Sequence, residues 1–141
     1  MSEIMSPGRK AQHTAKWART MTKWLITKYG NAKVRWRFVE FGGPTGSESY
    51  GIVDIMAIRK NHKTSAGQLK RGDLLDIILI QTKGGSAPRP TDEDVIRLTA
   101  VAKHHRAKSV VLAEWKKGSD LILHELVRRK WIARTPAELF K

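Results

Sequence analysis

The apolar run at residues 74–83 constrains the fold of this 141-residue chain more than any other feature. It contains four consecutive branched apolar residues at 77–80, is interrupted only by Asp76 and is closed by Gly84 and Gly85. A short apolar run bounded by turn residues is typical of a strand that is buried on both faces. We therefore predict that 74–83 is the central strand of a sheet.

One helix and two strands are predicted before this run. In residues 10–29, apolar side chains recur at helical spacing and define one stripe of an amphipathic helix, which we expect to be buried. These side chains are Trp17, Met21, Trp24 and Leu25. Residues 33–41 alternate apolar and basic side chains with the period of a half-buried strand, which would bury Trp36. A further strand is predicted at 52–59, and the polar, basic segment 60–72 would connect it to the central strand.

The C-terminal half continues with alternating elements. Thr91 and Asp94 have the spacing of a capping box, which predicts the start of a second helix. A short buried strand follows at 110–115, and it should run parallel to a neighbour because a helix crosses between them. A third helix is predicted over 118–130, and a final turn at Thr135. The order helix, three strands, helix, strand, helix indicates an α/β fold with a mixed sheet flanked by helices.

Charge is the main compositional signal. The chain has 27 Lys and Arg residues against 13 Asp and Glu residues, which gives a formal net charge of +14 and implies a polyanionic partner. No apolar run approaches the roughly 18 residues of a membrane-spanning helix, so we expect nucleic acid rather than a membrane. The absence of cysteine excludes disulfides. With no secretory signal at the start, we predict a cytoplasmic protein with a disordered segment at 1–9 and one domain at 10–141.

Three polar residues occupy strand positions where apolar residues would be expected. Asp54 interrupts the strand at 52–59, and Gln81 and Lys83 lie near the end of the central strand. Because side chains alternate along a strand, Gln81 and Lys83 leave the sheet on the same face. Asp54 would join them if the two strands pair.

This trio fits hydrolysis of a phosphodiester bond. The carboxylate of Asp54 and the amide oxygen of Gln81 are the kind of ligands that hold Mg²⁺, or Mn²⁺ in its place. The Lys83 amine would orient or help to deprotonate the attacking water and stabilise the charge that develops on the phosphate. We therefore predict a metal-dependent nuclease with Asp54, Gln81 and Lys83 as catalytic residues.

With these residues and this element order, the sequence resembles the PD-(D/E)xK nuclease superfamily from about Lys10 to Trp115. Two motifs carry the resemblance: Gly-Ile-Val-Asp at 51–54 and Ile-Gln-Thr-Lys at 80–83. The Gln in place of an acid is similar to Mrr-type restriction enzymes, and the size and layout are similar to small Holliday-junction resolvases. The resemblance implies a restriction-endonuclease-like αβββαβ core and a Mg²⁺-dependent DNA endonuclease acting on branched or junction DNA. Symmetric cleavage of both strands would require a homodimer.

The chain departs from the family pattern at three points. Val53 stands where a proline is common, Gln81 removes one negative charge from the metal site, and the first helix carries no glutamate. A substitute acid could come from Glu40, at the end of the first strand, or from Glu48 in the following glycine-rich loop. We prefer Glu40, because its strand parity directs it to the face of Trp36. The alternative function is a nucleic-acid-binding protein that retains the fold without catalysis.

Other charged residues are assigned to binding or to the surface. We expect contacts with the nucleic-acid backbone from Lys16, Arg19, Lys23, Arg35, Arg37, Lys70 and Arg71. Glu114 is interpreted as a strand-end charge. The histidines lack metal-ligand spacing and are expected to contact solvent or phosphate. They are His13, His62, His104, His105 and His124.

Overall fold

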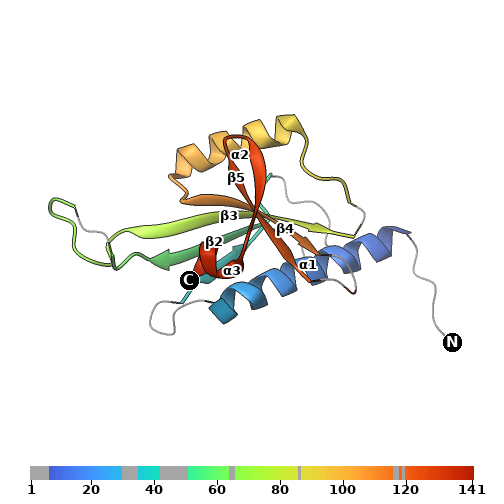
Figure 1. The fold of residues 1–141 in the computed structure, drawn as a ribbon, viewed down its shortest axis with the longest axis horizontal. Helices are drawn as coiled ribbons and strands as arrows, with labels where there is room; N and C mark the ends of the chain where they lie inside the picture. Colours follow the sequence, from blue (N-terminus) through green and yellow to red (C-terminus); the bar gives the residue numbers. More distant parts are fainter. Residues whose placement is uncertain are drawn as a thin grey trace.

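The computed structural model describes residues 7–29, 35–41, 51–63, 66–85, 87–115, 118 and 120–141, with side chains from Lys16 onward. The helices and strands follow one another along the chain in the order shown in Figure 1. Their bounds are α1 Pro7–Tyr29, β1 Arg37–Glu40, β2 Ile55–Lys60, β3 Leu75–Gly84, α2 Asp92–His105, β4 Ser109–Trp115, β5 Ile122–Val127, β6 Lys130–Arg134 and α3 Pro136–Phe140.

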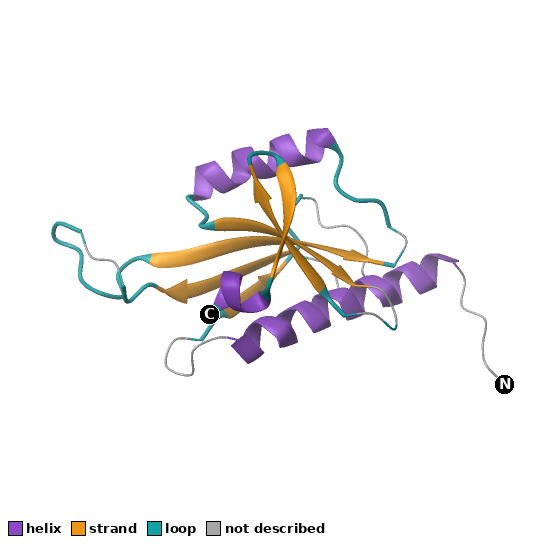
Figure 2. Cartoon of the chain, in the orientation of Figure 1, coloured by secondary structure: helices purple, strands orange, loops and turns teal. Residues whose placement is uncertain are grey.

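The strands form one six-stranded mixed sheet in the order β1-β2-β3-β4-β5-β6. The strands β1, β2 and β3 pair antiparallel, β4 pairs parallel to β3, and β5 and β6 continue antiparallel. The prediction that the apolar run is an inner strand parallel to the strand after the second helix is confirmed. Figure 2 shows α1 and α2 on opposite faces of the sheet, so the chain has an α/β fold with a mixed sheet flanked by helices.

Each face of the sheet has its own apolar core. On the α1 face, Ile78 and Ile80 of β3 pack with Val111 of β4 and with residues of α1 and α3. On the α2 face, Leu79 packs with Leu98 of α2 and with other apolar residues. Full burial of a side chain of this size stabilises the fold by roughly 1.5–3 kcal/mol. Alternate residues of β3 therefore serve the two cores, which explains its nearly continuous apolar sequence.

The buried stripe of α1 differs from the prediction. Ala18, Thr22 and Ile26 are buried, whereas Trp17 is 44% and Trp24 57% exposed. Small residues at 18 and 22 let the helix lie close to the sheet, and the Thr22 hydroxyl is satisfied because it donates to the Ala18 carbonyl at 2.6 Å. The prediction gave too much weight to large apolar side chains. It also started the helix at Lys10, whereas α1 begins at Pro7.

The third helix predicted over 118–130 is wrong. The structure has the β5–β6 hairpin there, with Leu123 paired opposite Arg134 and Val127 opposite Lys130. Because β5 is covered on both faces over part of its length, its apolar residues do not alternate cleanly and are compatible with helical spacing. The turn itself contains two arginines rather than the usual glycine or asparagine.

The C-terminal turn predicted at Thr135 is confirmed as the start of α3, with a complete capping box between Thr135 and Glu138. The helix places Phe140 against Trp36 in an edge-to-face contact with ring centroids 5.5 Å apart. The Trp36 indole N–H donates to the Phe140 carbonyl at 2.9 Å, and the Arg59 guanidinium lies over the Trp36 ring. These contacts hold α3 against Trp36, which directly precedes β1, and against Arg59 of β2.

Candidate functional site

Several polar residues gather at one edge of the sheet, which we call the site edge. It is the edge at which β1, β3 and β4 end and from which β2 and β5 start. Glu40 closes β1, Asp54 precedes β2, and Lys83 and Glu114 lie near the ends of β3 and β4. Topology therefore brings together residues that are far apart in the sequence.

Asp54 is held in the sheet by its backbone and by its carboxylate. Its N–H donates to the Ile80 carbonyl at 3.0 Å, but Ile80 is already the partner of Ile55, so the regular β2–β3 pairing ends there and does not extend to Asp54 and Gln81. The carboxylate Oδ2 accepts hydrogen bonds from the Thr82 N–H at 2.8 Å and from the Thr82 hydroxyl at 3.3 Å. Burial raises the pKa of Asp54, and the Thr82 hydrogen bonds and the charge of Arg19 offset this only in part.

Gln81 has a buried amide oxygen without a partner. Within the described part of the chain, Gln81 Oε1 is a buried side-chain oxygen that makes no hydrogen bond. A buried polar atom left in this state costs about 1–3 kcal/mol. Gln81 has the strand parity of Leu79, on the α2 face, whereas the Asp54 carboxylate bonds to Thr82, which has the parity of Ile80, on the α1 face. The side chains of Gln81 and Asp54 are therefore on different faces of the sheet.

Lys83 follows Gln81 on the same face of β3 and contacts a second acid. Its Nζ lies 3.6 Å from Glu114 Oε2 and donates to the Gly85 carbonyl at 3.2 Å. Glu114 Oε1 also accepts from Arg89 and lies 2.8 Å from His124 Nε2. Burial by itself would raise the pKa of Glu114, but the hydrogen bond and charge of Arg89, with the charges of His124 and Lys83, lower it.

The Glu114–His124 pair was missed by sequence reasoning. Glu114 was interpreted as a strand-end charge, but it has three basic neighbours. The expectation that His124 contacts solvent or phosphate is wrong, because its side chain is buried against Glu114. The cause is the false helix over 118–130: only a strand that pairs with β4 brings His124 opposite Leu112, two residues from Glu114.

Glu40, the preferred substitute acid, is already paired with basic residues. Its carboxylate lies 3.1 Å from Lys23 Nζ and 3.9 Å from Arg19 Nε on α1. Two of the residues expected to contact nucleic acid thus form ion pairs within the protein. The other candidate acid, Glu48, lies outside the described residues. The Phe41 N–H donates to the Asp54 carbonyl at 2.9 Å, so β1 ends beside Asp54.

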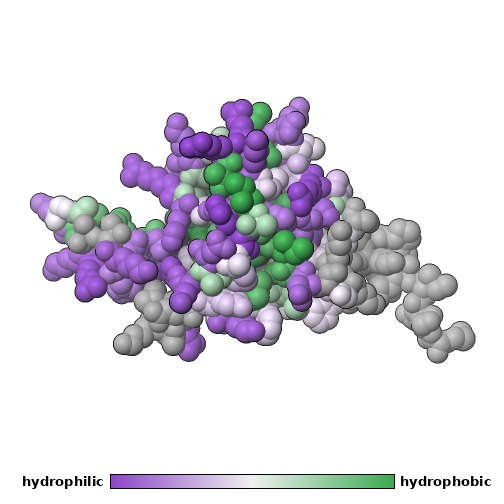
Figure 3. Space-filling model, viewed as in Figure 1, coloured by the Kyte–Doolittle hydropathy of each residue, from purple (hydrophilic) through white to green (hydrophobic). Residues whose placement is uncertain are grey.

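The remaining predicted backbone contacts fall into two groups. Lys16, Arg35 and Arg37 are exposed on α1 and β1. Lys70 and Arg71 are exposed in the β2–β3 connection, at the opposite edge of the sheet, where Arg71 Nε donates to the His62 carbonyl. Figure 3 shows hydrophilic side chains over much of the visible surface, including this projecting connection at the left. The basic residues are therefore not confined to the site edge.

The side chains at the site edge are compatible with a magnesium ion that takes most of its ligands from water and substrate. Among the described residues, no group of three or more His, Cys, Asp or Glu side chains is arranged to hold a metal. Mg²⁺ is nevertheless often bound through one or two carboxylates, with water and substrate phosphate completing its coordination. The Asp54 carboxylate meets that lower requirement by itself, whereas Gln81 Oε1 belongs to a side chain on the other face of the sheet.

Comparisons with protein-family models, with curated proteins and with solved structures found no match for this chain. In the described part of the chain, no helix has the length and apolar character needed to cross a membrane. The function must therefore be argued from the site and its surroundings.

Proposed function

We propose that this chain is a metal-dependent DNA endonuclease that hydrolyses phosphodiester bonds at the site edge. The observation that carries the proposal is Asp54, a carboxyl group at the site edge whose pKa is raised by burial. The burial of this acid costs stability at neutral pH in the protein alone. A bound cation would offset that cost, because it would favour the ionised carboxylate.

The fold supports the same proposal. The chain begins with α1, β1, β2, β3, α2 and β4, which is compatible with the αβββαβ core of the PD-(D/E)xK nucleases that the sequence resembles. Asp54 stands at the start of the second strand and the Gln-Thr-Lys motif at the end of the third. Fold similarity alone does not define an activity, so the proposal depends on the site residues.

Each site residue has a proposed role. Asp54 would hold Mg²⁺, or Mn²⁺ in its place; Gln81, which the sequence also predicted as a ligand, leaves the sheet on the other face, and Glu40 could join Asp54 only by giving up Lys23. The cation would neutralise charge on the scissile phosphate. Lys83, on the same face as Gln81, would have to leave Glu114 and the Gly85 carbonyl to reach the charge that develops on that phosphate. Branched or junction DNA is the proposed substrate, and a homodimer the form that cuts both strands.

A second candidate is a nucleic-acid-binding protein without catalysis. The ion pairs of the site favour it: Glu40 is bound to Lys23, and Lys83 is bound to Glu114. Glutamine at position 81 also leaves Asp54 as the one acid of the proposed metal site. Under this hypothesis the basic surface binds DNA, and Asp54 has a structural role as an acceptor for Thr82.

Cleavage assays separate the two candidates. Wild-type protein is incubated with supercoiled, linear and four-way-junction DNA in Mg²⁺, in Mn²⁺ and in EDTA. The nuclease proposal predicts metal-dependent cleavage that Asp54→Ala abolishes while DNA binding persists, and that the exposed control Asp120→Ala retains. Binding without cleavage of any substrate in either metal would establish the second candidate. Light scattering of the free and junction-bound protein tests the homodimer.

A further inference from the structure

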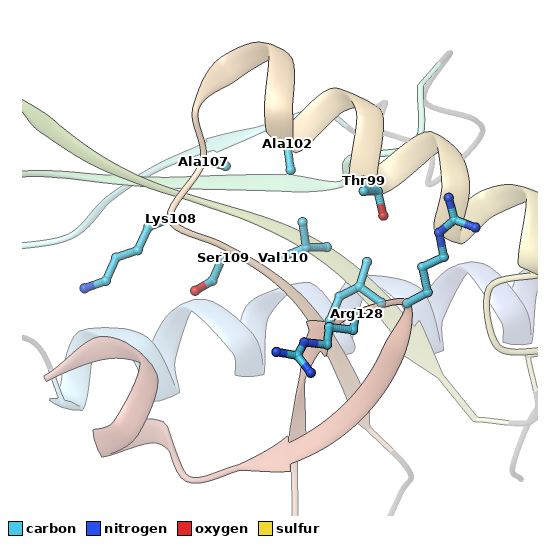
Figure 4. Close-up of a pocket in the computed structure, with 9 residues that line it drawn as sticks. Thr99, Ala102, Ala107, Lys108, Ser109, Val110 and Arg128 are labelled. Atoms are coloured by element: carbon cyan, nitrogen blue, oxygen red, sulfur yellow. The ribbon is translucent and has the colours of Figure 1, made fainter.

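A pocket of about 340 Å³ lies far from the site edge. This open pocket is bordered by the end of α2, the start of β4 and the β5–β6 hairpin, whose turn lies against α2 in Figure 1. Figure 4 shows Val110 between Lys108 and Arg128, with Thr99 and Ala102 of α2 above them. We call the edge of the sheet at which β4 begins the far edge. The pocket has an apolar floor and basic residues around it.

The basic residues of the pocket lack acidic partners. Lys108, Arg128 and Arg129 line it, and no acidic side chain does. Within the described residues none of these three cations forms an ion pair. The nearby acid Glu125 is bound to Arg134 and to the Ser109 hydroxyl. The positive charge of the pocket is therefore uncompensated by the described part of the protein.

The turn of the hairpin is strained at the two arginines. Arg128 and Arg129 have φ values of 50° and 65°, so both adopt the left-handed conformation. A two-residue turn of this kind favours Asn-Gly, because side chains disfavour positive φ. Each unfavourable conformation costs on the order of 1 kcal/mol. The chain thus has arginine at two positions where asparagine and glycine would make the fold more stable.

The end of α2 does not cancel this charge. A helix C-terminus carries a partial negative charge that opposes anion binding. Here the Ala102 carbonyl already accepts hydrogen bonds from the N–H groups of Arg106 and Ala107. The exposed side chains of Lys103, Arg106 and Lys130 add further positive charge around the pocket. The surroundings therefore remain attractive to an anion.

We propose that this pocket binds a backbone phosphate of nucleic acid and makes the far edge a DNA contact separate from the site edge. Guanidinium groups suit phosphate because they present paired donors. The Lys108 N–H donates to the Ile77 carbonyl, and Ile77 precedes Lys83 by six strand residues, or about 20 Å. The two contacts are thus distinct. The inference rests on the proposed nucleic-acid partner, but it does not require cleavage.

The test uses a variant that removes both charges and relieves the strain, Arg128→Asn/Arg129→Gly. Binding of a fluorescent DNA duplex is measured by anisotropy in EDTA at several salt concentrations. We expect affinity to fall roughly tenfold and the slope of log K against log salt to lose about two units. The melting temperature should rise, because Asn-Gly suits the turn. Weaker binding together with higher stability excludes unfolding as the cause.

The matched control is Arg97→Ala/Lys141→Ala, which removes two exposed charges that do not line the pocket. It should leave the salt slope within one unit of the wild-type value. If the hairpin variant binds DNA with the same affinity and salt slope as the wild type, the pocket proposal is overturned and the nuclease proposal is unaffected. The same titration with vesicles of phosphatidylcholine and phosphatidylserine provides a second arm. A loss confined to vesicles would also overturn the proposal, because the pocket would then serve a lipid surface.

Discussion

Replacing Asp54 by asparagine should stabilise this protein at neutral pH while abolishing its proposed activity. The Asp54 carboxyl group is largely buried, and burial raises its pKa above the ordinary value of 3.8. The ionised form is therefore less favourable in the folded chain than in the unfolded chain. Asparagine keeps an oxygen that can accept the hydrogen bonds from the Thr82 N–H and hydroxyl, and it carries no charge.

The size of the effect follows from the pKa and the chain length. Each pKa unit between the folded and unfolded states is worth about 1.4 kcal/mol. For 141 residues, the entropy of unfolding is about 0.3 kcal/mol per kelvin, so each unit corresponds to roughly 4–5 °C in Tm. Because the folded pKa is raised, wild-type stability falls as pH rises from 3.8 through the folded pKa of Asp54. The gain in Asp54→Asn should thus be full above that pKa and vanish below 3.8.

The assay is thermal unfolding of wild type, Asp54→Asn and the exposed control Asp120→Asn, from acidic to neutral pH. The control should differ little from wild type. Addition of Mg²⁺ at tenfold its Kd should raise wild-type stability by about 1.4 kcal/mol and leave Asp54→Asn unchanged. A lower Tm for Asp54→Asn at neutral pH would refute the reasoning, because the hydrogen bonds to the carboxylate would then outweigh its burial.

Four further substitutions test the site and the core. Gln81→Glu should leave the Mg²⁺ concentration needed for half-maximal thermal stabilisation unchanged, like the exposed Gln68→Glu, because residue 81 and Asp54 are on different faces of the sheet. Glu114→Gln should cost about 1–3 kcal/mol in urea unfolding above pH 4.5, and the difference should shrink as pH falls through its lowered pKa. Phe140→Ala should cost about 3–5 kcal/mol, or roughly 10–17 °C in Tm, because its ring is fully buried against Trp36. Thr91→Ala should cost about 0.5–2 kcal/mol in urea unfolding by removing the cap of α2.

Sequence patterns were sufficient to predict the inner strands β3 and β4 and the helix α2 between them. Strand β3 could be predicted because its apolar run serves two cores, and α2 because Thr91 and Asp94 form the capping box that their spacing indicated. The parallel pairing of β4 followed from the helix between the strands. In each case the sequence carries a distinct signal of the element: an apolar run, a capping box or a crossover helix.

Failures arose where packing between elements decides the structure and leaves no distinct pattern in the sequence. The stripe of α1 was misplaced because helix–sheet distance, set by Ala18 and Thr22, is not visible in hydrophobicity alone. The strand β5 was mistaken for a helix because both of its faces are covered over part of its length. The second error concealed part of the site, since Glu114 and His124 meet only when β5 pairs with β4.

The two proposed sites share a physical property: each holds residues that stability alone would not select. At the site edge, the Asp54 carboxyl group is largely buried, and the amide oxygen of Gln81 has no hydrogen-bond partner. At the far edge, two arginines occupy a turn that favours asparagine and glycine. Local departures of this kind are expected where function competes with stability. Asp54→Asn and Arg128→Asn/Arg129→Gly should therefore both stabilise the fold, and each should remove a different function: the first metal binding and cleavage, the second the far-edge contact with DNA.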